Sequence, residues 1–150
     1  MLPETVARLA KVPGIVGLKE AKGDLDRVRT LLALDLPKSF ALLSGDDATA
    51  RESILLGFHG DISVTANVVP RQMAEMCRAA SAGNAELAAE IDAKIAVLHS
   101  QLFCEANPIP VKWALEQMGK MGPGIRLPLV PLDSRYHTLV REALQTVGVI

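Results

Sequence analysis

The stretch that decides the fold is Gly14-Ile15-Val16-Gly17-Leu18-Lys19-Glu20-Ala21. Its apolar run is short, contains β-branched residues and follows Pro13, which is typical of a buried strand in a parallel sheet rather than of a helix. We expect this strand to cover about Ile15 to Lys19. A lysine at the end of a buried strand is partly withdrawn from water, so Lys19 is a candidate Schiff-base nucleophile. The alternative is a strand-end lysine whose ammonium group simply reaches solvent.

Composition and charge narrow the class of protein. Hydrophobic residues make up 49% of the 150 residues and charged residues 22%, which is ordinary for a soluble globular protein. The net charge of −1 offers no attraction to nucleic acid or to an acidic membrane surface. No apolar run is long enough to span a membrane, and the first residues lack the pattern of a signal peptide. We therefore expect a cytoplasmic protein that binds neither nucleic acid nor membrane.

Two further β-rich runs, Phe40–Leu43 and Asp61–Asn67, follow the first one along the chain. Each of the three runs precedes a segment whose apolar residues have helical spacing. Asp24 is expected to cap the helix after the first run, and a carboxylate of the Asp46-Asp47 pair to cap the next helix. Strands that alternate with helices predict a parallel sheet with crossover helices.

After Ala82 the pattern becomes helical. Helices are predicted over Glu86–Leu102 and Val111–Met118, and a last helix is predicted to begin at Asp133 or Ser134. Three βα units do not close a sheet, and a complete (β/α)8 barrel needs about 250 residues. The chain can therefore supply only the last part of such a barrel.

In parallel βα folds, residues that bind ligands lie at the carboxyl ends of the strands. The sequence places Lys19-Glu20, Ser44–Asp47 and Ile62–Asn67 at these positions. A glycine at position 45 lets a ligand approach the backbone closely. Cys77 and Cys104 lack the spacing of metal ligands and are expected to be buried or partly buried free thiols. No metal site is predicted.

Five motifs are similar to one known family. They are Gly17–Ala21, Leu42–Asp47, Gly60–Asn67, Asn107–Ala114 and Leu127–Leu129. In this order and spacing, the chain resembles the C-terminal half of the dihydrodipicolinate synthase family, pyruvate-dependent class I aldolases related to N-acetylneuraminate lyase. The Gly-Asp-Asp and Ser-Val-Thr-Ala-Asn segments favour the synthase branch over the lyase branch.

The resemblance implies a fold and a chemistry. Residues 1–82 would form the last three βα units of a (β/α)8 TIM barrel, an α/β fold, and residues 83–150 a C-terminal helical domain. Lys19 matches the lysine that condenses with pyruvate to an imine and then an enamine, which attacks aspartate semialdehyde in lysine and diaminopimelate biosynthesis. Ile62 matches the residue whose backbone lies against pyruvate, and Gly45 the glycine that lines the pocket. The covalent imine takes the place of a cofactor.

The resemblance also implies that other family residues precede the segment matched here. These are the threonine pair and glycine-rich segment that hold the pyruvate carboxylate, the tyrosine proton relay, the entrance arginine and the lysine feedback site. Three hypotheses remain open: the C-terminal portion of a synthase, a catalytically inactive remnant or assembly partner, and a truncated product. Family members are tetramers, so the expected protein partners are further copies of the chain or a complementary N-terminal half.

Overall fold

The computed structural model describes residues 1–150, which divide into two compact units. The first unit comprises Met1–Ser63 and Met76–Ala89, and the second comprises Val64–Glu75 and Glu90–Ile150. Helices α4 (Pro70–Ser81) and α5 (Ala85–Gln101) each contribute residues to both units. The division into domains 1–82 and 83–150 that the sequence suggests stays a prediction.

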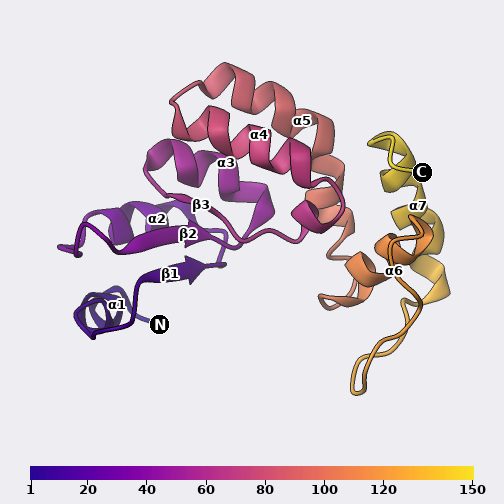
Figure 1. Cartoon of the computed structure of the whole chain (residues 1–150), viewed down its shortest axis with the longest axis horizontal. Coiled ribbons are helices and arrows are strands. Elements are labelled where there is room, and N and C mark those ends of the chain that lie inside the picture. Colours follow the sequence, from indigo (N-terminus) through magenta and orange to yellow (C-terminus); the bar gives the residue numbers. More distant parts are fainter. The chain divides into compact units, whose positions relative to one another are not determined.

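The first unit alternates helices and strands (Figure 1). Its three strands pair in parallel in the order β1-β2-β3, so the predicted α/β class and parallel sheet are confirmed. Helix α3 packs against β2 and β3, and α2 packs against α3. The elements in chain order are α1 (Pro3–Leu9), β1 (Gly17–Glu20), α2 (Leu25–Leu32), β2 (Ala41–Ser44), α3 (Asp47–Leu56) and β3 (Gly60–Asp61).

Two aspartates begin helices of the first unit by capping them, as predicted. The Asp24 carboxylate accepts hydrogen bonds from the backbone N–H groups of Asp26 and Arg27, at 3.0 and 3.1 Å. The Asp46 carboxylate accepts from the backbone N–H and the hydroxyl of Thr49, at 3.1 and 2.7 Å. These bonds satisfy N–H groups that have no partner inside the first helical turn. Asp47 is the first residue of α3 rather than its cap, and it is buried.

Two strand predictions differ from the structure. Ile15 and Val16 precede β1 and are 37% and 74% exposed, so the first strand starts later than expected. The third strand ends at Asp61, and the 3₁₀ helix η1 (Thr65–Asn67) occupies the second part of the segment predicted as strand. Local bonds replace the ladder here, because the backbone N–H and the side-chain amide of Asn67 both donate to the carbonyl of Val64 at 3.0 Å.

The sheet has two different faces, because successive residues of a strand point to opposite sides. Leu42 and Ser44 point toward the helices and are only 4% and 2% exposed. By register, Leu18 lies beside Leu42, and Glu20, Ser44 and Asp61 lie in one row. We call this the covered face. Lys19 and Leu43 pair with each other on the opposite side, which we call the open face.

The second unit is helical. The predicted helices are confirmed to within a few residues, and Asp133 caps η2 by accepting from the backbone N–H of Arg135 at 3.0 Å. The rings of Trp113 and His137 stack with centroids 4.6 Å apart, so Trp113 serves as a packing residue of this unit. No helix of the chain is long and apolar enough to cross a membrane. Besides η1 and its parts of α4 and α5, the unit contains α6 (Ile109–Gln117), η2 (Ser134–Tyr136) and α7 (His137–Thr146).

Candidate active site

Lys19 is the third residue of β1 and lies on the open face of the sheet. The residue is exposed, which agrees with the alternative of a strand-end lysine that reaches solvent and contradicts the expectation that its side chain is partly withdrawn from water. The physical reason is the direction of its side chain, since the helices that pack on the sheet bury the opposite face. The amine is therefore accessible to a dissolved carbonyl compound.

Gly45 and Ile62, the other two predicted site residues, lie at the same end of the sheet as Lys19. The parallel ladder continues one residue beyond β2 and β3: the N–H of Gly45 donates to the carbonyl of Glu20, and the N–H of Ile62 donates to the carbonyl of Ser44, both at 2.9 Å. Strand alternation then places both residues on the open face. The structure therefore gathers all three predicted residues on one face.

The side chain of Lys19 packs directly against Gly45. A Cβ atom added to Gly45 would lie 2.8 Å from Cγ and 3.0 Å from Cδ of Lys19 and would overlap its Cε. Real Cβ atoms rarely approach other carbon atoms so closely, so Lys19 holds this position only because residue 45 has no side chain. Ile62 is 48% exposed, which leaves its backbone and side chain open to a ligand.

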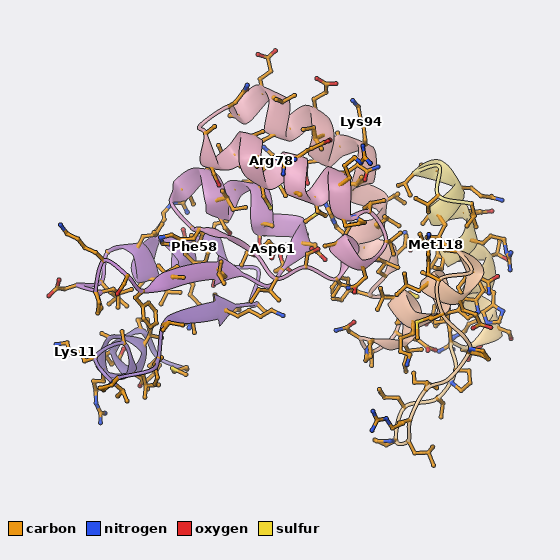
Figure 2. All side chains as sticks on the ribbon, viewed as in Figure 1. Lys11, Phe58, Asp61, Arg78, Lys94 and Met118 are labelled. Carbon is orange, nitrogen blue, oxygen red and sulfur yellow. The ribbon has the colours of Figure 1, made fainter.

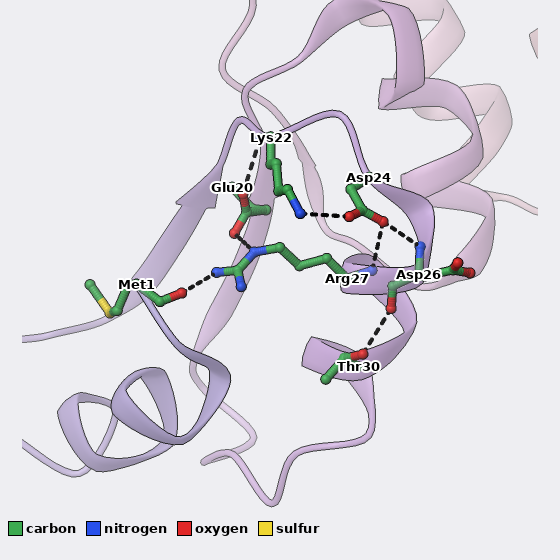
Figure 3. Close-up of polar contacts among 7 residues, drawn as sticks. All are labelled: Met1, Glu20, Lys22, Asp24, Asp26, Arg27 and Thr30. Atoms are coloured by element: carbon green, nitrogen blue, oxygen red, sulfur yellow. Dashed lines mark hydrogen bonds and ion pairs between the residues drawn. The ribbon is translucent and has the colours of Figure 1, made fainter.

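Glu20 and Arg27 form a network that fixes the end of β1 (Figure 3). The two side chains form an ion pair and are only 12% and 15% exposed. Glu20 also accepts a hydrogen bond from the backbone N–H of Lys22 at 3.0 Å, and Arg27 donates to the carbonyl of Met1 at 2.8 Å. Because Glu20 is engaged in this way, we assign it to the support of the strand end rather than to proton transfer.

An open groove runs beside Lys19 on the first unit. Its lining contains the cationic side chains of Lys19, Lys22 and Arg27 and the single carboxylate of Glu20, together with Met1 and Leu18. Lys22 is 64% exposed and pairs with Asp24 at 2.8 Å. An excess of cations over carboxylates in a groove attracts anions. The site can therefore bind a small carboxylate beside an accessible amine.

The covered face holds an acidic residue that the sequence analysis did not single out. The pKa of Asp61 is raised from its ordinary value of 3.8 to about 7, mainly by burial and also by the neighbouring carboxyl of Asp47, while Ser44 and Lys19 oppose the rise. Both carboxylate oxygens of Asp61 are inaccessible to water. Strand alternation is the signal in the sequence that could have found it. Asp61 directly precedes Ile62, so if Ile62 lies on the ligand-binding face of the sheet, Asp61 must point to the opposite face.

Cys77 and Cys104 are partly buried free thiols, as predicted. Burial raises the pKa of both thiols, and the carboxylates of Asp61 and Asp47 raise that of Cys77 further. Because a thiol reacts as its thiolate, neither cysteine is a good nucleophile at neutral pH. Nowhere in the chain do three His, Cys, Asp or Glu side chains gather in a way that could hold a metal ion.

A separate small cavity lies in the second unit. It has a volume of about 50 Å³ and is lined by Lys112, Trp113, Glu116 and neighbouring residues. The volume is enough for a few water molecules. None of the predicted site residues lines it.

Comparison with known proteins identifies the family of the chain. The sequence model of the dihydrodipicolinate synthetase family matches residues 1–147. The chain belongs to this family, whose fold is the TIM barrel. It is 55% identical over 150 residues to the 4-hydroxy-tetrahydrodipicolinate synthase of Methylibium petroleiphilum and 57% identical over 148 residues to that of Cellvibrio japonicus. These alignments cover 100% and 99% of this chain but 51% of each relative.

Solved structures of the family match the chain closely in shape. The chloride-inhibited synthase of Acinetobacter baumannii, complexed with pyruvate, has a TM-score of 0.94 at 50% identity. The synthase of Thermotoga maritima has the same TM-score at 39% identity. Each comparison covers 99% of this chain, with 50% and 52% of the respective solved chain. The chain thus spans about half the length of the curated relatives it matches.

Proposed function

We propose that the chain is the C-terminal portion of a 4-hydroxy-tetrahydrodipicolinate synthase and that Lys19 forms the Schiff base with pyruvate. The observation that carries the proposal is the exposed amine of Lys19, packed over Gly45 on the face that also contains Ile62. Relatives of that name and the pyruvate complex of the Acinetobacter protein support it. In this proposal, the three strands are the last three βα units of a TIM barrel.

The proposed chemistry begins with addition of the neutral Lys19 amine to the keto carbon of pyruvate. The resulting carbinolamine takes up a proton and loses water, which leaves a protonated imine. The imine draws electrons from the neighbouring methyl group, so a base can remove a methyl proton and give the enamine. The enamine carbon then attacks the aldehyde of aspartate semialdehyde. Lys22 and Arg27 in the groove favour the approach of both carboxylate substrates, and the imine serves as the electron sink without a metal or an organic cofactor.

A second candidate is an assembly partner that lacks activity by itself. Its motivation is the pair of sheet edges at β1 and β3, together with apolar residues such as Val16, which is 74% exposed. Unpaired strand edges readily pair with another chain. The partner in this case is either a further copy of the chain or a complementary N-terminal half. The cytoplasmic location expected from the sequence stays a prediction.

Imine trapping tests the proposed function. The folded chain is incubated with pyruvate and borohydride, and its intact mass is measured. We expect one reduced pyruvate adduct on the native chain, none on Lys19→Arg, and an unchanged adduct on the matched control Lys38→Arg, an exposed lysine outside the groove. A folded native chain without an adduct contradicts the proposal.

A turnover assay then separates the two candidates. It supplies pyruvate and aspartate semialdehyde to the chain and follows product formation. Adduct formation together with turnover supports a catalyst that is complete in this chain. Adduct formation without turnover supports a chain that contributes Lys19 but needs a partner for the later steps.

A further inference from the structure

The buried carboxyl of Asp61 has no role in the chemistry described above. Asp61 ends β3 and pairs in register with Ser44 (Figure 2 labels its position). Neither of its carboxylate oxygens is exposed, and neither has a partner at hydrogen-bond distance and angle. The hydroxyl of Ser44 donates instead to the carbonyl of Asp46 at 3.1 Å. A buried carboxylate in these surroundings is costly unless it holds a proton.

The groups that face Asp61 come from three elements. Asp47 of α3 is 2% exposed and is its acidic neighbour, and Cys77 of α4 contributes a neutral thiol. Lys19 of β1 is the one cation that acts on Asp61. Two carboxyl groups buried side by side do not both ionise easily, and a proton on one of them converts their repulsion into a hydrogen bond. At pH values below about 7, Asp61 therefore retains a proton for much of the time.

The strand ends connect this pair to the open face. Asp61 directly precedes Ile62, and Ser44 directly precedes Gly45. The N–H of Ile62 donates to the carbonyl of Ser44, so these two strand ends are also bonded to each other. Helix α3, which begins with Asp47, packs against both β2 and β3. Electrostatic repulsion between Asp61 and Asp47 would therefore shift the ends of β2 and β3, and these strand ends also carry Gly45 and Ile62.

We propose that Asp61 is a positioning residue: the proton that it shares with Asp47 holds the ends of β2 and β3 in the arrangement that sets Gly45 and Ile62 beside Lys19. Loss of this proton leaves two buried negative charges, which repel each other and displace the strand ends. This inference rests on the proposed function, since it concerns how well the Lys19 site binds its oxo acid.

The first test follows pyruvate binding as a function of pH. Adduct formation with cyanoborohydride is measured against pyruvate concentration between pH 6 and pH 8.5 for the native chain, Asp61→Asn and the exposed control Asp35→Asn. We expect the half-saturating pyruvate concentration of the native chain and of Asp35→Asn to rise several-fold as the pH passes through about 7. Asp61→Asn, which cannot ionise, loses this rise. Identical pH profiles for the native chain and Asp61→Asn overturn the proposal.

The second test needs no pyruvate. Because the folded-state pKa of Asp61 lies above its unfolded value, the folded chain holds more protons between pH 3.8 and about 7. Its contribution to stability is therefore largest at low pH, decreases as the pH rises through this window, and is constant above it. Urea unfolding should show this decrease for the native chain and a smaller one for Asp61→Asn. If the free energy of unfolding depends on pH equally in both proteins, the proposal of a shared proton is wrong, whether or not the chain forms an imine.

A second variant provides the same test in case the first one does not fold. If Asp61→Asn does not fold, Asp47→Asn removes the other member of the pair and is expected to weaken the same pH dependence. If the native chain forms no adduct at any pH but shows the stability titration, the proposed function fails and the shared proton stands. A folded Asp47→Asn variant that retains the full titration overturns the inference.

Discussion

The two faces of the small sheet consist of alternate residues of the same strands, yet they differ in burial and in what their side chains contact. On the covered face, Leu42 and Ser44 are 4% and 2% exposed beneath helices. On the open face, the side chains of Lys19 and Ile62 are exposed. The difference shows how a parallel sheet separates two tasks. One face supplies the burial that holds the fold, and the other presents reactive groups at the strand ends.

Adjacent leucines provide the sharpest test of this difference. Leu42→Ala removes a side chain from the covered face and should lower the free energy of unfolding by about 2–4 kcal/mol, since it leaves a cavity. Leu43→Ala, on the open face, should cost less than about 1.5 kcal/mol because its side chain is only partly buried. Urea unfolding of both variants measures the two values. Equal losses would show that the two faces are not distinct in packing.

Gly45→Ala should affect chemistry more than stability. The new Cβ overlaps the side chain of Lys19, which is flexible and moves away from the strand end. We expect the rate of adduct formation with pyruvate to fall about tenfold, equivalent to about 1.4 kcal/mol in the barrier. The matched control is Gly124→Ala, because an added Cβ there meets no atom within 4 Å. An unchanged rate in Gly45→Ala would show that the contact between Lys19 and Gly45 has no part in the reaction.

Asp46 follows Gly45 but belongs with the stabilising residues. Its carboxylate caps α3, so Asp46→Ala should lower the free energy of unfolding by about 1 kcal/mol. Adduct formation should change little, because the carboxylate is engaged with Thr49. Thermal unfolding and imine trapping on the same sample measure both effects, with the exposed Asp35→Ala as the control. A large loss of adduct in a folded Asp46→Ala variant would assign this carboxylate to the reaction instead.

Much of the local fold follows from the sequence. Short β-rich runs between helical segments predict the parallel sheet, and Asp24 and Asp46 stand where a helix needs acceptors for its first N–H groups. The grouping of Lys19, Gly45 and Ile62 also follows, because parallel strands end at the same edge. These features depend on periodicity and spacing, which a single sequence displays.

The missed features depend on tertiary surroundings. An apolar run does not reveal which of its residues another element covers, so it does not decide whether Lys19 is exposed or partly withdrawn from water. The Ser-Val-Thr-Ala-Asn segment has strand propensity, but local bonds to the carbonyl of Val64 turn it into η1. The raised pKa of Asp61 could not be predicted either, since it arises from burial beside Asp47, a residue on a different element.

Site mapping of the reduced pyruvate adduct tests the central claim most directly. The native chain is treated with limiting pyruvate and borohydride, digested and analysed by peptide mass spectrometry, so that the adduct on each lysine is quantified. Because only Lys19 lies on the open face beside Gly45 and Ile62, we predict that nearly all of the adduct is on Lys19. An adduct spread evenly over the exposed lysines, or concentrated on another one such as Lys22, would contradict the account.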